Sequence, residues 1–137
     1  MCGIFGYIGS KNCNSILIEG LKKLEYRGYD SVGVAISNGD KLSVIKKRGR
    51  VSSIEEEVMG VNGNIGIGHT RWATHGKPSD INAHPHTHDK FTIVHNGIIE
   101  NYFDLKTQLL REKVNFLSET DTEVIAALLS KITMVIC

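Results

Sequence analysis

The chain has 137 residues, which is enough for one hydrophobic core and too few for two ordinary domains. Sixteen Lys and Arg against fifteen Asp and Glu leave a net charge of +1, so no bulk field draws the protein to nucleic acid or to an anionic membrane. The 41% hydrophobic content is typical of a globular protein and excludes extensive disorder. We find no apolar run of membrane-spanning length, no signal peptide and no paired cysteine motif. A cytoplasmic protein with reduced thiols is expected.

The first half of the chain predicts alternating strands and helices. Leucines at helical spacing favour a helix, and Asn38-Gly39 between two apolar runs is a strong hairpin signal. Ser52 with Glu55, or Ser53 with Glu56, predicts a capping box that opens a short helix. The expected elements are a strand over 2–9, a helix over 15–25, paired strands over 32–37 and 42–46, a short helix that ends near residue 60, and a strand over 64–71.

The second half begins with residues 73–90, which contain both prolines and no sustained periodicity and therefore predict a long loop. A strand is expected over 91–95 and helices over about 100–113, with Leu105, Leu109 and Leu110 on one face, and about 122–131. Residues 132–137 are apolar and strand-like, with no turn or cap, as if the chain stopped inside an element. Together these elements predict an α+β fold with a largely antiparallel sheet.

Cys2 is a candidate nucleophile because of its position in the chain. Removal of Met1 would leave a cysteine with a free α-amino group, whose reference pKa of about 7.7–8.0 suits it to accept a proton from a thiol near neutral pH. Nucleophile and base would then belong to one residue. The alternative, from position alone, is a small hydrophobic residue buried in the first strand.

Six short blocks contain the other candidate residues. They are CGIFG at 2–6, YRGYDS at 26–31, GHTRWATHG at 68–76, NAHPH at 82–86, HNGIIEN at 95–101 and SETDTE at 118–123. Their order resembles the glutaminase domain of class II, N-terminal-nucleophile glutamine amidotransferases. The amino-acid sequences of the second and third blocks are most similar to those of the isomerising glutamine:fructose-6-phosphate aminotransferases, also called glucosamine-6-phosphate synthases. The resemblance runs from residue 1 to about residue 131.

This resemblance implies a fold and a reaction. The fold is an N-terminal-nucleophile (Ntn) αββα sandwich, here incomplete, with residues 1–137 forming the N-terminal portion of a type-2 glutamine amidotransferase domain and the sugar isomerase domains absent. The reaction is hydrolysis of L-glutamine to glutamate and ammonia through a thioester on Cys2. In full-length relatives the ammonia serves glucosamine 6-phosphate synthesis from fructose 6-phosphate, and a homodimer could form through the absent domains.

Individual roles are implied position by position. Asn96, through its side-chain amide, and Gly97, through its backbone N–H, resemble the donors to the oxyanion. Arg71 and Asp121 resemble the residues that bind the α-carboxylate and the α-ammonium of glutamine. The pocket wall is assigned to Trp72, Thr74, His75 and Gly76, and supporting roles to Arg27, Gly28, Asp30 and His84.

Other functions fit the sequence less well. His84, His86, His88 and Asp89 do not follow the usual H-x-H-x-D-H order and include a proline, so no metal is expected, and no cofactor. A dinucleotide fingerprint fails because Arg71 stands where the third glycine belongs, and the basic cluster at 46–50 lacks aromatic neighbours for nucleic acid. The remaining alternatives are a phosphoribosylamine-forming or asparagine-forming relative and an inactive truncated fragment.

Overall fold

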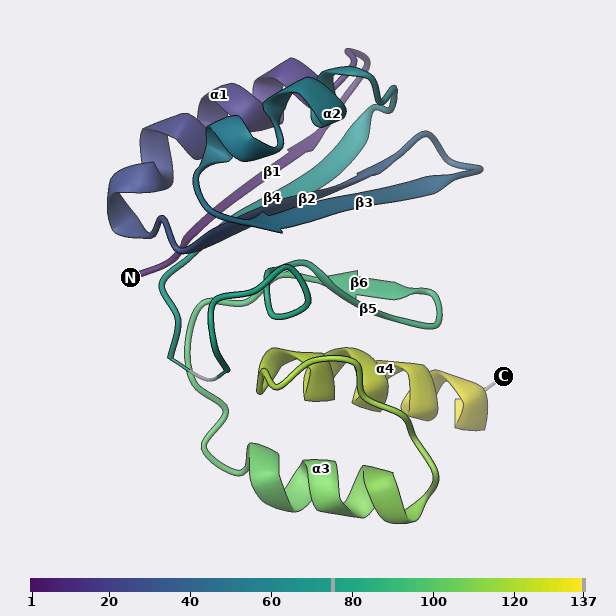
Figure 1. The fold of residues 1–137 in the computed structure, drawn as a ribbon. Helices are drawn as coiled ribbons and strands as arrows, with labels where there is room; N and C mark the ends of the chain where they lie inside the picture. Colours follow the sequence, from purple (N-terminus) through teal and green to yellow (C-terminus); the bar gives the residue numbers. More distant parts are fainter. Residues whose placement is uncertain (75, 137) are drawn as a thin grey trace.

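The computed structural model describes residues 1–74 and 76–136, arranged in four layers (Figure 1). Two helices cover one face of a four-stranded sheet, whose other face meets a two-stranded sheet, and two further helices lie beyond it. The elements are β1 (Gly3–Ile8), α1 (Asn14–Leu24), β2 (Ser31–Ser37), β3 (Leu42–Arg48), α2 (Glu55–Met59), β4 (Ile65–Arg71), β5 (His86–His88), β6 (Phe91–Ile93), α3 (Tyr102–Arg111) and α4 (Thr122–Ile136), with short 3-10 turns at Glu25–Arg27 and Val51–Ser53.

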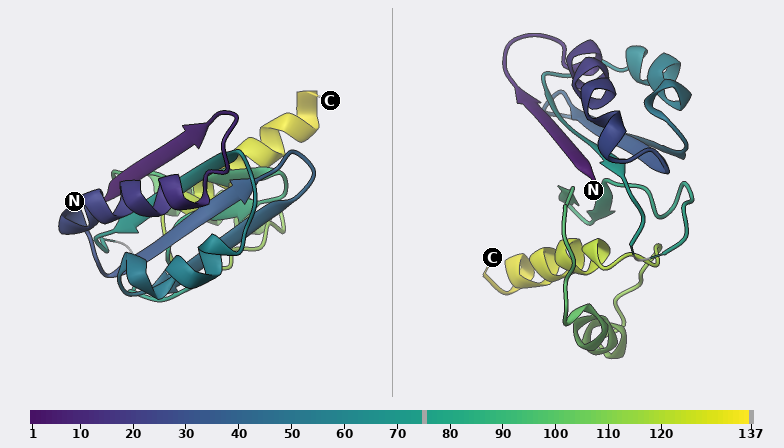
Figure 2. Two further views of the ribbon diagram at one scale, coloured as in Figure 1. Left: turned by 90° about the horizontal axis from the view of Figure 1, so that it is seen from above. Right: turned by 90° about the vertical axis from the view of Figure 1, so that its left-hand side faces the viewer.

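The layering confirms the predicted α+β, αββα class. From the top of Figure 1 downwards, α1 and α2 lie above the sheet of order β1-β4-β2-β3, then come β5 and β6, then α4 and finally α3. The perpendicular views in Figure 2 show the same separation of the two sheets. All described strand pairs are antiparallel, which confirms the predicted sheet type, and the 38–40 hairpin joins β2 to β3 as expected.

The register brings three strand ends to one edge. β4 pairs with β1, Gly3 lying opposite Thr70, and with β2, Ser31 lying opposite Arg71. Because both pairings are antiparallel, the beginnings of β1 and β2 adjoin the end of β4. Cys2, the residues before β2 and the residues after β4 therefore meet at this edge.

Alternation along β4 decides which side chains enter the space between the sheets. An added Cβ on Gly68 would lie 2.8 Å from Leu21 of α1, so this position faces the helices. Successive strand residues point to opposite faces, and His69 and Arg71 consequently belong to the inter-sheet side. The main core lies on the helix side, where α1 and α2 pack on Val32, Val34 and Ile36 of β2.

A smaller core joins α3 and α4 through Leu109, Val124 and Ala127. Leu110, predicted to share one face of α3 with Leu105 and Leu109, is 52% exposed. Leu105 and Leu109 do pack inward.

Three local expectations are wrong. Residues 86–88, placed in a loop by their composition, form β5 because β6 supplies backbone partners. Residues 132–136 continue α4 as helix rather than strand; Cys137 lies outside the described residues. The capping box does not form: α2 starts after Ile54 without a side-chain cap, and the Ser53 hydroxyl donates instead to the Arg50 carbonyl at 2.6 Å.

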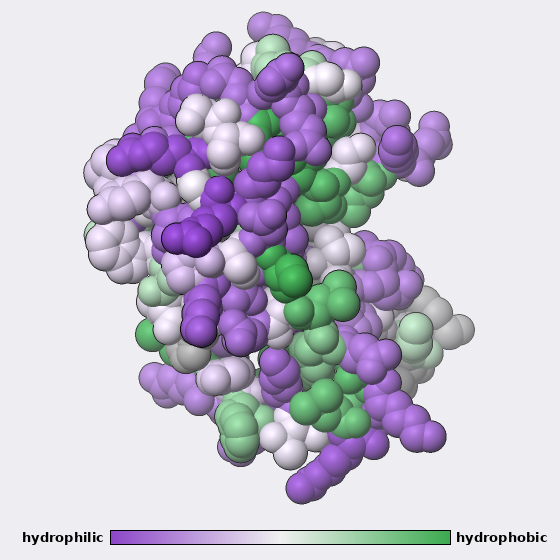
Figure 3. Space-filling view, in the orientation of Figure 1, coloured by the Kyte–Doolittle hydropathy of each residue, from purple (hydrophilic) through white to green (hydrophobic). Residues whose placement is uncertain are grey.

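Hydrophobic side chains also gather on the surface between the upper and lower halves of the molecule (Figure 3). A hollow in this region, between β3 and the lower layers, is lined by Leu42, Val44, Ile81, Pro85 and Leu117 together with polar groups. Within the described part of the chain, no helix has the length and apolarity needed to cross a membrane.

Candidate active site

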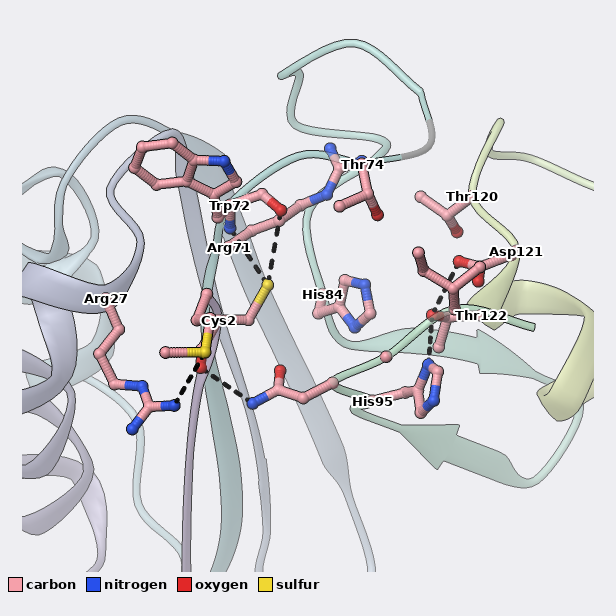
Figure 4. A pocket seen from close by; sticks show the side chains of 14 residues that line it. Cys2, Arg27, Arg71, Trp72, Thr74, His84, His95, Thr120, Asp121 and Thr122 are labelled. Carbon is pink, nitrogen blue, oxygen red and sulfur yellow. Dashed lines mark hydrogen bonds between the residues drawn. The ribbon is translucent and has the colours of Figure 1, made fainter. Parts of the chain in front are cut away.

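A pocket of about 500 Å³ opens at the end of the four-stranded sheet where β1 and β2 begin and β4 ends (Figure 4). The upper sheet and its loops supply one wall, and the segments after β6 and before α4 supply the other. Its lining consists of Met1, Cys2, Arg27, Arg71, Trp72, Thr74, His84, His95, Asn96, Gly97, Ile98, Thr120, Asp121 and Thr122.

Cys2 lies at the start of β1 with its sulfur in the pocket. The Trp72 backbone N–H donates a hydrogen bond to Cys2 Sγ at 3.2 Å, and the thiol donates to the Trp72 carbonyl oxygen at 3.6 Å. Cys13 contrasts with it, because that side chain is fully buried in the main core and burial raises its thiol pKa. Both cysteines are free thiols, but only Cys2 combines access with a hydrogen-bond donor.

Asn96 and Gly97 follow β6 and reach Cys2 from the opposite wall. Asn96 Nδ2 donates to the Cys2 carbonyl at 3.0 Å, and Asn96 Oδ1 lies 2.9 Å from His69 Nε2. Gly97 has a φ of +145°, a backbone conformation that side chains rarely adopt. No described residue accepts a hydrogen bond from the Gly97 N–H, so this group can donate to a ligand.

Arg71 ends β4 with a side chain that is only 3% exposed. Its Nη2 donates to the Gly76 carbonyl at 3.1 Å and its Nη1 to the Lys77 carbonyl at 3.4 Å. Burial lowers the pKa of this guanidinium, while the carboxylates of Asp30 and Asp121 act in the opposite direction. Arginine nevertheless stays charged, so a buried cation lines the pocket.

Asp121 provides the opposite charge from the start of α4. Its side chain is 4% exposed, and Oδ2 accepts a hydrogen bond from the Ile99 N–H at 2.8 Å. That bond ties the loop carrying Gly97 to α4. A carboxylate at a helix N-terminus is stabilised by the helix dipole. Figure 4 shows Arg71 and Asp121 approaching the pocket from different walls.

Gly28 and Asp30 hold the Cys2 wall from behind without lining the pocket. An added Cβ on Gly28 would lie 2.7–2.9 Å from the peptide that joins Arg71 to Trp72, so only glycine allows this approach. The Asp30 carboxylate accepts a short hydrogen bond from the Ala73 N–H. These contacts set the position of the N–H group that faces Cys2 Sγ.

His84 lines the pocket and stacks on His69, with ring centroids 4.0 Å apart and planes 11° from parallel. Two residues without a predicted role hold its loop in place. An added Cβ on Gly33 would lie 2.1 Å from the His84 carbonyl, and the Lys46 ammonium donates to the carbonyls of residues 81, 83 and 85 at 2.9–3.2 Å. A glycine inside a strand signals such close backbone approach, whereas Lys46 offers no local signal.

Two histidines of the 84–88 segment, His84 and His86, contact other protein groups. His86 Nε2 lies 3.0 Å from Thr120 Oγ1, and its ring meets His84 edge-on. Across residues 1–74 and 76–136, no three His, Cys, Asp or Glu side chains converge as a metal site would require.

The structure thus brings nine of the predicted site residues to the pocket: Cys2, Arg27, Arg71, Trp72, Thr74, His84, Asn96, Gly97 and Asp121. Gly28, Asp30 and Gly76 contact this wall without lining it, and His75 lies outside the described residues. Trp72 is 50% exposed and stands edge-on to Tyr29 rather than in a core. Sequence reasoning gave no role to His69, His95, Thr120 or Thr122, although all four lie within the motif blocks.

The fold is that of the Ntn amidotransferases. A solved glutamine phosphoribosylpyrophosphate amidotransferase from B. subtilis superimposes with a TM-score of 0.82 at 29% identity, covering 95% of this chain and 29% of the other. A second structure, described as the allosteric regulatory enzyme of purine biosynthesis, gives a TM-score of 0.80 at 31% identity, covering 92% of this chain and 28% of the other.

The chain belongs to the family described as glutamine amidotransferase domain, which matches residues 41–135. A glutamine–fructose-6-phosphate aminotransferase (isomerizing) from Clostridium acetobutylicum is 62% identical over 129 residues, covering 91% of this chain and 21% of that protein. The Aquifex aeolicus protein of the same description is 56% identical over 135 residues, with 96% and 23% covered. The chain therefore spans about a fifth of the length of these relatives.

Proposed function

We propose that this chain hydrolyses L-glutamine to glutamate and ammonia, with Cys2 as the nucleophile. One observation carries the proposal: a single pocket holds the Cys2 thiol, two donors on the opposite wall, a buried cation and a buried carboxylate. Free glutamine has the matching groups, namely an electrophilic side-chain amide, a carboxylate and an ammonium. We further propose that the 137 residues form the first part of a type-2 glutamine amidotransferase domain.

The chemistry begins once Met1 is removed and Cys2 carries a free α-amino group. This amine takes the thiol proton, and the thiolate adds to the amide carbon of glutamine. The resulting oxyanion accepts hydrogen bonds from Asn96 Nδ2 and the Gly97 N–H. The amine returns the proton as the C–N bond breaks, ammonia leaves, and water hydrolyses the γ-glutamyl thioester to glutamate and free thiol.

Arg71 and Asp121 select the free amino acid. A guanidinium offers paired N–H donors to the α-carboxylate, and the Asp121 carboxylate pairs with the α-ammonium. Glutamine within a peptide lacks the free α-carboxylate and α-ammonium, so it cannot form these two charged contacts and should bind more weakly. The pocket is accordingly assigned to free glutamine.

We assign the ammonia to the conversion of fructose 6-phosphate to glucosamine 6-phosphate, carried out by parts of the protein that the relatives possess beyond this segment. The identity of 56–62% to relatives named for fructose 6-phosphate supports this acceptor. Phosphoribosylamine formation is the second candidate because of the B. subtilis structure, but that protein is only 29% identical. The free thiol that the reaction needs fits a cytoplasmic setting.

The test measures ammonia and glutamate release by folded chain from which Met1 has been removed. We expect a γ-glutamyl thioester, and we expect 6-diazo-5-oxonorleucine to label Cys2 alone in mass spectrometry. Cys2→Ala should abolish release and labelling, whereas the matched variant Cys13→Ala should retain both. Activity in Cys2→Ala, or a folded sample that neither reacts nor releases ammonia, contradicts the proposal.

A further inference from the structure

His69 lies behind Asn96, at the inter-sheet side of β4, and is fully buried. Its Nε2 is 2.9 Å from Asn96 Oδ1 and 3.1 Å from the His95 carbonyl oxygen. Both neighbours are acceptors, so Nε2 must carry a proton and donate it to them. The opposite ring nitrogen, Nδ1, has no hydrogen-bond partner among the described residues.

The His69 ring is neutral at physiological pH. Burial lowers its pKa to about 4, the charge of Arg71 and the neighbouring His95 act in the same direction, and the hydrogen bonds to Asn96 and His95 only partly oppose them. With one proton, held on Nε2, the imidazole presents a donor to Asn96 and leaves Nδ1 unprotonated. The tautomer is therefore set by the neighbours of the ring.

We propose that His69 is a positioning residue that locks the Asn96 carboxamide with Nδ2 facing the Cys2 side of the pocket. The inference rests on the proposed glutaminase chemistry and adds a group that does not itself touch substrate. A carboxamide can rotate by half a turn and exchange its oxygen and nitrogen with little change in shape. The His69 donor satisfies the oxygen and makes one of these two orientations favourable.

The favoured orientation leaves the correct hydrogen for catalysis. Nδ2 has two hydrogens; one points to the Cys2 carbonyl at 3.0 Å, and the second remains for the oxyanion. Rotation would place Oδ1 against the Cys2 carbonyl and put an acceptor where negative charge develops. Donation from His69 to Oδ1 also polarises the amide and strengthens its N–H groups as donors.

His84 keeps the His69 ring in place from the other side. The two rings are stacked nearly parallel, and the His84 loop is fastened to the upper sheet through Gly33 and Lys46. This connected set of contacts joins β2, β3 and β4 to the Asn96 segment, so the orientation of the amide is determined by the sheet rather than by the exposed loop alone.

Two variants of similar size separate the donor from the shape of the side chain. His69→Gln retains an N–H donor near the position of Nε2, whereas His69→Met fills the space without one. We expect His69→Met to lower kcat for glutamine about 10- to 100-fold with little change in KM, short of the roughly 10²–10³-fold loss on removing an oxyanion donor. His69→Gln should recover most of that loss, and alkylation of Cys2 by iodoacetamide, which forms no oxyanion, should proceed at the unaltered rate in both.

The control is His88→Gln, a histidine of β5 outside the pocket, which should match the unaltered chain. The inference is overturned if His69→Met has the same kcat as the unaltered chain, or if only its KM changes. Nitrogen-15 NMR of the unaltered chain tests it without activity or substitution: a neutral Nε2–H ring at pH 6 supports it, and an Nδ1–H or charged ring refutes it. Failure of the proposed glutaminase function would instead appear as ammonia release by Cys2→Ala.

Discussion

At the scale of single residues, surroundings decide which groups can react. Cys2 and Cys13 are both free thiols. Cys13 is fully buried in the main core, whereas Cys2 lines the pocket and accepts a hydrogen bond from the Trp72 N–H. Arg71 and Asp121 are buried charged groups that line the same pocket, and both are also held by hydrogen bonds to backbone groups. Residues near the end of β4 where the pocket opens therefore differ in surroundings from residues of the same type elsewhere in the chain.

Gly28→Ala tests the wall behind Cys2. The new methyl group would lie 2.7–2.9 Å from the Arg71–Trp72 peptide and displace the N–H that faces Cys2 Sγ. We expect kcat to fall by about 10-fold or more, since small misplacements at a reaction centre are costly. Gly60→Ala is the matched control, because its nearest neighbour would be an ordinary 3.5 Å contact. Ammonia release measures both, and equal rates would contradict this role of Gly28.

Asp121→Asn tests the ammonium site. The amide keeps the size of the side chain and an acceptor for the Ile99 N–H, but it loses the charge that would pair with the substrate. A hydrogen bond to a charged group is worth about 1.5–3 kcal/mol, so KM should rise by roughly 10-fold or more with a smaller effect on kcat. The exposed Asp104 on α3 supplies the control Asp104→Asn. An unchanged KM in Asp121→Asn would remove its binding role.

At the scale of elements, the site depends on how the segment before β5 is held against the upper sheet. The Lys46 ammonium bonds three carbonyls of that segment, and burial lowers its pKa. Gly33 allows the His84 carbonyl to approach β2. The strands therefore position a loop that has little regular structure of its own.

Gly33→Ala should destabilise the protein by forcing this loop away from β2. The added Cβ would lie 2.1 Å from the His84 carbonyl oxygen, and overpacking of this kind costs about 1–3 kcal/mol. The free energy of unfolding in urea is the measurement. Gly6→Ala in β1 is the comparison, since its nearest neighbour would be at 3.8 Å; equal destabilisation of the two variants would refute the explanation.

At the scale of the whole molecule, the space between the sheets is filled by three buried histidines, His69, His84 and His86. Burial lowers the pKa of each ring, to about 4 for His69 and about 3 for His86, from an ordinary value of 6.5. The two sheets therefore contact each other through neutral imidazole rings.

These histidines make stability depend on pH. Above about pH 6.5 the rings are neutral in both states and contribute no pH dependence. Below it the unfolded chain binds protons that the folded chain refuses, so the free energy of unfolding falls as pH drops through 6.5 towards 4, by about 1.4 kcal/mol per pH unit for each proton taken up. Urea unfolding between pH 7 and 5 measures the slope, which His86→Gln should reduce. A flat profile would contradict neutral buried rings.

Most of the helices and strands, and the kinds of residue that line the pocket, can be predicted from the amino-acid sequence. Periodicity is local, so α1, the β2–β3 hairpin and β4 can be predicted from neighbouring residues, and the resemblance of the motif blocks predicts Cys2 as the nucleophile. The tertiary structure alone decided the contacts between distant positions: β5 pairing with β6, Gly33 meeting His84, Lys46 capping the loop carbonyls, and His69 reaching Asn96. Such contacts depend on which strands become neighbours in space, and local sequence patterns do not predict the pairing of strands that are distant in the chain.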